Sequence, residues 1–195
     1  MELDYNFFDP ENIRPPAKGM VLISEPFLQD NYFKRSIVLL AEHTAEGTVG
    51  FVLNKPVNLH VSEVINDFPE TDALVSLGGP VNTNTLHYIH TLGDIVPNSV
   101  KVLDNIYWGG DFNVIKKLVE SKNLNKDNIR FFLGYSGWHE NQLEDELAEN
   151  AWVVAEIDPI EIMSPMNKHF WKNTLKKMGK KYEMWSNFPE NPQMN

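Results

Sequence analysis

The feature that most constrains this chain is a series of short apolar runs, each bounded by residues that favour turns. Three of them, residues 20–24, 36–42 and 48–53, follow one another near the start of the sequence. Runs of about four to eight residues rich in Val, Ile, Leu and Phe are typical of β-strands. The Glu46-Gly47 pair between the second and third runs predicts a tight connection and therefore an antiparallel pair. We expect all three runs to lie in one sheet.

The rest of the chain interleaves strand-like and helix-like segments. Strands are predicted at residues 73–77, 85–91, 99–103, 129–133 and 152–157, and helices at 62–65, 111–121, 140–149 and 167–178. These segments lack the regular rhythm of repeated βαβ units. The order therefore favours the α+β class, with a mixed, largely antiparallel sheet and packed helices.

The segment Gly-Tyr-Ser-Gly-Trp at residues 134–138 is close to the Gly-x-Ser-x-Gly elbow that exposes a catalytic serine. The elbow needs its last glycine for close packing of strand and helix, and Trp138 occupies that position. We therefore interpret the segment as a strand-to-helix turn in which Gly137 takes positive φ and Trp138 anchors the helix. This interpretation gives Ser136 a structural role.

Composition excludes several kinds of site. The chain contains no cysteine, so disulfides, thiolate metal sites and cysteine nucleophiles are absent. No cofactor motif is present, and we predict no cofactor. His87 and His90 are three residues apart in a predicted strand, where their side chains point to opposite faces, so we predict no metal site.

Charge argues against direct recognition of nucleic acid. The net charge of −10 repels phosphates, and no helix-turn-helix pattern is visible. Positive charge gathers only near the C-terminus, at Lys168, Lys172, Lys176, Lys177, Lys180 and Lys181. We interpret this segment as a helix whose apolar stripe packs on the rest of the protein. Sequence-specific nucleic acid binding is therefore not expected.

Neither a membrane span nor a secretion signal is visible. No apolar run approaches the roughly 20 residues of a transmembrane helix. The acidic start of the chain lacks the basic and apolar regions of a signal peptide. We expect a cytoplasmic protein.

Several segments, in order and at family-like spacing over residues 19–155, resemble the YqgE/AlgH family. They are residues 19–26 with Asp30, Phe33, Arg35 and Ser36; Glu42-His43; 47–56; 78–81; Leu86-His87; 133–138; and Gln142, Leu143, Glu144, Glu146, Asn150 and Trp152. The chain departs from the family pattern after Trp138, where His139-Glu140-Asn141 replaces a Gly-Pro-Gly-like stretch.

The resemblance implies a compact α+β protein from a family whose members are often described as transcriptional regulators. Pro10, Pro15 and Pro16 predict an extended lead-in over residues 1–18. We expect a family-like domain over 19–157 and a basic, proline-containing extension over 158–195 packed on that domain. The family has no agreed activity, cofactor or catalytic residues to transfer. Its motifs give candidate binding residues only: His43, Asn54, Gly78, Gly79, His87, Ser136 and Trp138.

Two hypotheses about function remain open. The first is a non-enzymatic regulatory or binding protein that acts through a protein partner or a small ligand. The alternative is an enzyme, such as a hydrolase, with a pocket formed by His43, Asn54, His87 and Ser136. The enzyme requires these side chains to converge, whereas their separation favours the binding protein.

Overall fold

The structure is a computed structural model that describes residues 9–11, 14–124, 127–164 and 169–189. Its strands are β1 (Val21–Ser24), β2 (Ile37–Thr44), β3 (Gly47–Val52), β4 (Pro56–His60), β5 (Leu74–Leu77), β6 (Val81–His90), β7 (Val100–Leu103), β8 (Ile106–Trp108), β9 (Ile129–His139) and β10 (Trp152–Ala155). Its helices are α1 (Val61–Val64), α2 (Phe112–Glu120), α3 (Gln142–Ala148), α4 (Pro159–Met163), α5 (Phe170–Lys177) and α6 (Lys180–Ser186).

The strands form one mixed sheet in the order β10-β1-β2-β3-β9-β6-β8-β7, with β5 beside β9 and β4 beside β5. All of these pairs are antiparallel except the parallel pair β5–β9. The α+β prediction is confirmed, as is the placement of the first three runs in one sheet with β2 and β3 antiparallel. The sheet curls so that the residue before β1 approaches β7. A Cβ on Gly19 would lie 2.9 Å from the Cβ of Leu103 in β7.

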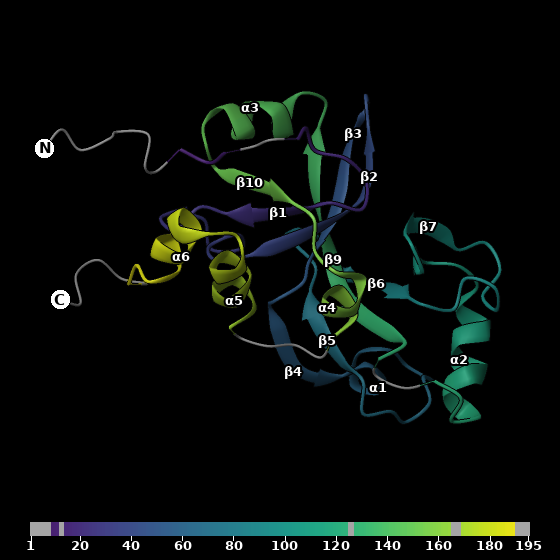
Figure 1. Ribbon diagram of the computed structural model, residues 1–195. Coiled ribbons are helices and arrows are strands. Elements are labelled where there is room, and N and C mark those ends of the chain that lie inside the picture. The colour runs from purple at the N-terminus through teal and green to yellow at the C-terminus, as the bar shows by residue number, and fades with distance from the viewer. Residues whose placement is uncertain (1–8, 12–13, 125–126, 165–168, 190–195) are drawn as a thin grey trace, which may run out of the picture.

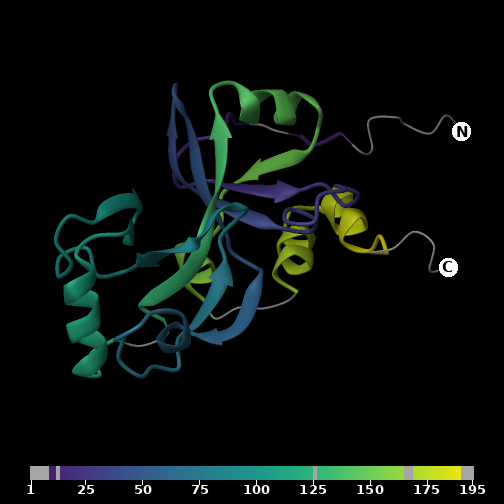
Figure 2. The same ribbon diagram turned by 180° about the vertical axis from the view of Figure 1, so that it is seen from behind.

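Helices cover both faces of the sheet. Figure 1 shows α3 above strands β1 and β10 and α5 and α6 below them, and the reverse view in Figure 2 agrees. Leu143 of α3 packs with Leu22 and Leu40 on one face. Trp171 and Leu175 of α5 pack with other core residues on the opposite face. A third cluster joins α1 and α2 to the far end of β9.

The predicted turn at residues 134–138 is wrong, because β9 runs without interruption from Ile129 to His139. The segment stays extended because β3 pairs with it on one side and β6 on the other. The positive φ also falls at a different glycine. Gly134 has φ +65°, and a Cβ there would lie 2.7 Å from the carbonyl oxygen of Val81.

The sequence prediction missed four short elements: β4, β8, α4 and α6. Strand β4 begins at Pro56, a residue tolerated at the start of a strand on the sheet edge. The helix predicted at 167–178 appears as α5, and residues 167 and 168 lie outside the described part of the chain. No helix in the described residues is both long and apolar enough to cross a membrane.

Candidate functional site

A bulge in β2 determines which way His43 points. The pairing of β2 with β3 shifts between Leu40 and Glu42, so one extra residue stands in β2. Beyond this bulge His43 pairs with Thr48. Strict alternation from Leu40 would turn His43 away from α3, whereas the bulge turns it toward that helix.

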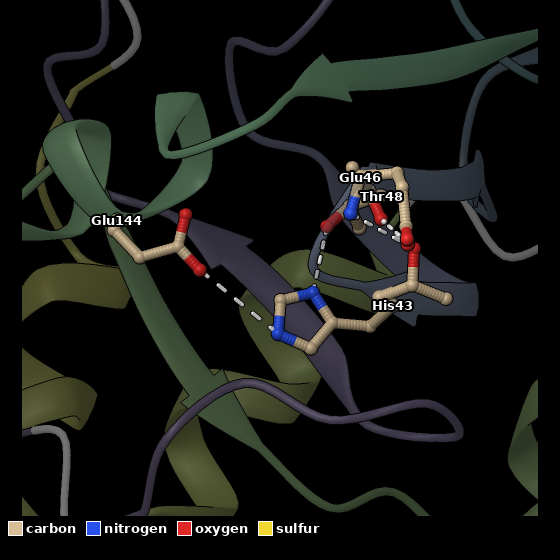
Figure 3. A network of polar contacts seen from close by, with 6 residues as sticks. His43, Glu46, Thr48 and Glu144 are labelled. Carbon is tan, nitrogen blue, oxygen red and sulfur yellow. Dashed lines mark hydrogen bonds and ion pairs between the residues drawn. The ribbon is translucent and has the colours of Figure 1, made fainter.

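His43 lies between a threonine and a glutamate (Figure 3). Its Nδ1 is 2.7 Å from Thr48 Oγ1, and its Nε2 is 4.0 Å from Glu144 Oε1 on α3. The order hydroxyl, imidazole, carboxylate is that of a catalytic triad. However, Thr48 is only 4 % exposed, so a substrate cannot reach it as a nucleophile. The contact instead links the β2–β3 hairpin to α3.

The turn of that hairpin is held by its own polar contacts (Figure 3). The backbone N–H of Glu46 donates to Thr44 Oγ1 over 3.3 Å. A separate hydrogen bond between the Glu46 carboxylate and the Thr44 side chain lowers the pKa of this exposed carboxyl. Glu46 therefore belongs to the hairpin turn, as its position between the two strands predicts.

Glu146 of α3 binds the indoles of two tryptophans. Trp138 Nε1 and Trp152 Nε1 donate to its Oε2 over 2.8 and 2.7 Å. Gln142 donates to its Oε1 over 3.0 Å. A carboxylate that accepts from two nearly buried indoles fixes α3 on the sheet, so Trp138 anchors the helix, as the sequence predicted.

Ser136 is fully buried and packs against the Gly78-Gly79 segment. Its hydroxyl donates to the carbonyl oxygen of Gly78 over 2.9 Å. A Cβ on Gly78 would lie 2.3 Å from the carbonyl oxygen of Gly134, and one on Gly79 would lie 2.4 Å from the backbone nitrogen of Ser136. The glycines therefore allow two backbones to approach closely, and the serine hydroxyl joins them.

Asn54 also has a structural partner at each end of its amide. Its Oδ1 accepts from the backbone N–H of Ile37 over 2.9 Å, and its Nδ2 donates to the carbonyl oxygen of Arg35 over 2.8 Å. Arg35 has φ +51°, an uncommon conformation for a residue with a side chain. Asn54 thus holds the loop that leads into β2.

His87 lies on the face opposite His43, among aromatic rings. Its ring centroid is 5.4 Å from that of Phe51, 6.3 Å from Trp108 and 5.6 Å from Tyr135. Its Nε2 is 3.0 Å from Thr85 Oγ1. Burial lowers the pKa of His87, because desolvation penalises the charged imidazolium. We call the rings of His87, Phe51, Trp108 and Tyr135 the His87 cluster.

The predicted site residues do not form one pocket. Phe51 and Thr48 are three residues apart in β3, so their side chains lie on opposite faces, and the histidines that they contact are separated by the sheet. Only Gly78, Gly79 and Ser136 come together. Three cavities, of about 260 Å³ beside Ile160, 400 Å³ beside Tyr182 and 690 Å³ beside His60, are lined by none of the predicted site residues.

Sequence reasoning missed the aromatic partners of His87. Thr85 and His87 could have been paired, because residues two apart in a strand share a face. Trp108 and Tyr135 come from other strands, and no local pattern points to them. No local pattern distinguishes Glu146 from the other acidic residues of α3, because its tryptophan partners lie on two different strands.

Two further polar side chains that the sequence points to have structural partners. His90 is buried, its Nε2 lies 2.8 Å from the carbonyl oxygen of Gly109, and its Nδ1 accepts from the backbone N–H of Leu92 over 3.1 Å. Asp111 caps α2 by accepting from the backbone N–H of Asn113. The described residues contain no group of three His, Asp or Glu side chains arranged to hold a metal ion.

A mixed, largely antiparallel sheet with helices on both faces defines an α+β protein. The AlgH-like family profile matches residues 21–183. The chain belongs to this family.

Relatives and solved structures agree with this assignment. A UPF0301 protein of Bacteroides thetaiotaomicron is 43 % identical over 197 residues and the full length of both chains. Another, from Parabacteroides distasonis, is 43 % identical over 182 residues and 92 % of each chain.

Two solved structures share the fold at lower identity. A crystal structure of a Corynebacterium diphtheriae protein matches with TM-score 0.78 at 24 % identity, covering 96 % of this chain and 100 % of that one. The solution structure of the AlgH protein from Pseudomonas aeruginosa matches with TM-score 0.71 at 23 % identity, covering 91 % and 98 %.

Proposed function

We propose that the protein is a non-catalytic binding protein with a regulatory role, and that the His87 cluster is its binding face. The separation of the candidate catalytic side chains supports this proposal most directly. Ser136 donates its only hydroxyl proton to Gly78, and within the described residues no histidine is among its hydrogen-bond partners. A serine without a base and without access to solvent is not a nucleophile.

The His87 cluster has the character of a recognition surface. Trp108 and Tyr135 are half-buried, above the fully buried ring of Phe51. Partly exposed aromatic rings beside one polar group are typical of surfaces that bind ligands, because they offer contact area at low cost in conformational entropy. The neutral imidazole adds a directional contact.

Tryptophan fluorine NMR tests the proposal. All five tryptophans lie in the described residues, and four of them, Trp138, Trp152, Trp171 and Trp185, are at most 4 % exposed. In protein labelled with 5-fluorotryptophan, the Trp108 signal is assigned by its loss in Trp108→Phe. We expect small-molecule fractions of a bacterial lysate to shift this signal, with the four buried signals as internal controls.

The hydrolase alternative predicts a reactive Ser136 instead. A fluorophosphonate probe that labels Ser136, together with ester hydrolysis lost in Ser136→Ala, would contradict a non-catalytic role. A ligand that shifts only the buried tryptophans next to α3 would place the binding face elsewhere.

A further inference from the structure

The hydrogen bonds of Thr85 fix the position of the proton on His87. The Thr85 hydroxyl donates to the carbonyl oxygen of Asn82 over 2.7 Å. A hydroxyl has a single proton, so Thr85 Oγ1 can only accept from His87 Nε2, 3.0 Å away. The neutral ring of His87 therefore has its proton on Nε2 and a lone pair on Nδ1.

The lone pair on Nδ1 is available to a ligand. The hydrogen bond from Nε2 to Thr85 is the polar contact of this ring in the described residues. Among the described residues Nδ1 has no hydrogen-bond partner, and it is not completely buried. Burial lowers the pKa of His87, which keeps the ring neutral and Nδ1 unprotonated at neutral pH.

Aromatic rings flank this acceptor. Trp108 and Tyr135 come from β8 and β9, and both ring centroids lie within 6.3 Å of that of His87. The Phe51 ring lies 5.7 Å from Trp108 and forms the base of the cluster. The planes of Trp108 and Tyr135 are tilted by 44° and 77° from that of His87, so a flat molecule can stack on the exposed part of one of these two rings while its edge contacts the imidazole.

We propose that the His87 cluster binds a flat aromatic or heteroaromatic molecule whose N–H or O–H group donates a hydrogen bond to Nδ1 of His87. The inference rests on the proposed function and specifies its ligand class. A ligand that offers only acceptors would face the lone pair of Nδ1 without a proton between them. An anion would in addition meet the field of a chain with net charge −10.

The first test examines the proton without any ligand. In ¹⁵N NMR spectra, the His87 signals are assigned by their loss in His87→Phe. We expect a protonated Nε2 and an unprotonated Nδ1 at pH 7. Thr85→Val removes the hydroxyl acceptor and should increase the population with the proton on Nδ1. A proton on Nδ1 in the unmodified protein would overturn the inference.

The second test compares two probes that differ by one donor. Indole has an N–H group, and 1-methylindole does not. Titration of the 5-fluorotryptophan-labelled protein should shift Trp108 with both, and indole should bind roughly fivefold more tightly, the effect expected for one hydrogen bond. His87→Phe keeps a ring but loses the acceptor, so it should abolish this preference. The matched control His139→Phe, at an exposed histidine, should retain it.

The outcomes separate the two proposals. Equal affinity for indole and 1-methylindole, with Trp108 shifted by both, would overturn the donor requirement and leave the binding face intact. If neither probe shifts Trp108 but a lysate fraction does, the ligand class is wrong. If nothing shifts Trp108, both the ligand class and the proposed function are contradicted.

Discussion

The indole nitrogen of Trp138 donates to Glu146 Oε2 over 2.8 Å, and this contact joins the end of β9 to α3. The same oxygen accepts from Trp152 Nε1, so one carboxylate satisfies two indoles that are at most 4 % exposed. A glutamate in an acidic helix thus acts as a structural hub.

Removal of this carboxylate should destabilise the protein. Glu146→Ala leaves both indole N–H groups without their acceptor, and we expect a loss of about 2–4 kcal/mol in the free energy of unfolding. Urea unfolding followed by tryptophan fluorescence measures this loss. The control Glu149→Ala, at the exposed residue that directly follows α3, should change stability by less than about 0.5 kcal/mol. Equal urea midpoints for the two variants would show that the Glu146 carboxylate contributes nothing to the stability of the fold.

Ser136→Ala should preserve the fold and any cellular activity. The variant loses the hydrogen bond to Gly78, which we expect to cost about 1 kcal/mol. Circular dichroism and urea unfolding measure the fold and the cost. The unmodified protein should not react with a fluorophosphonate probe, because the hydroxyl is buried. Labelling that disappears in the alanine variant would instead assign Ser136 a catalytic role.

Acid should destabilise the protein through His90. Burial lowers the pKa of this histidine, so the folded state favours the neutral ring. Protonation would also convert Nδ1, which accepts from Leu92, into a donor. The unfolded chain binds the proton near pH 6.5, so the stabilising contribution is complete above that pH and is lost as pH falls through the lower folded pKa.

The test compares stability at pH 7 and pH 5. His90→Gln removes the titrating group, so the drop in melting temperature between the two pH values should be smaller than in the unmodified protein. His139→Gln, at an exposed histidine, serves as the control and should behave like the unmodified protein. The same drop in all three proteins would refute the assignment to His90.

Nucleic acid should bind weakly at most. Lys172, Lys176 and Lys180 have no carboxylate within ion-pair distance in the described residues, and α5 buries Trp171 and Leu175 in the core. We expect no sequence-specific complex at about 150 mM salt in a mobility-shift assay. Weak retention at low salt should decrease steeply as salt rises, because phosphate contacts release counterions.

Substitution of the three lysines by Gln should remove this retention without unfolding the protein. The combined substitution of Lys116, Lys117 and Lys122 by Gln, in and just after α2, is a charge-matched comparison that should have less effect. A discrete complex that survives excess non-specific competitor at about 150 mM salt would restore direct transcriptional regulation as the leading function.

The sequence by itself determined the local elements with clear patterns. The apolar runs that became β1, β2 and β3 identify themselves because each is short, rich in branched and aromatic residues and bounded by turns. Asp111 predicted the start of α2 because its carboxylate can accept from a backbone N–H at the helix terminus. The family motifs added the fold class, which the sheet confirms.

Only the tertiary structure decided which side chains meet. Alternation along a strand has a period of two, and every bulge resets it. The bulge after Leu40 turns His43 toward α3, and the positive φ of Gly134 within β9 lets Phe132 and Tyr135 face the same core cluster. The partners of His87 come from β3, β8 and β9, and their approach depends on strand order and on the curl of the sheet. Such contacts depend on pairing between distant segments, which no local sequence pattern encodes.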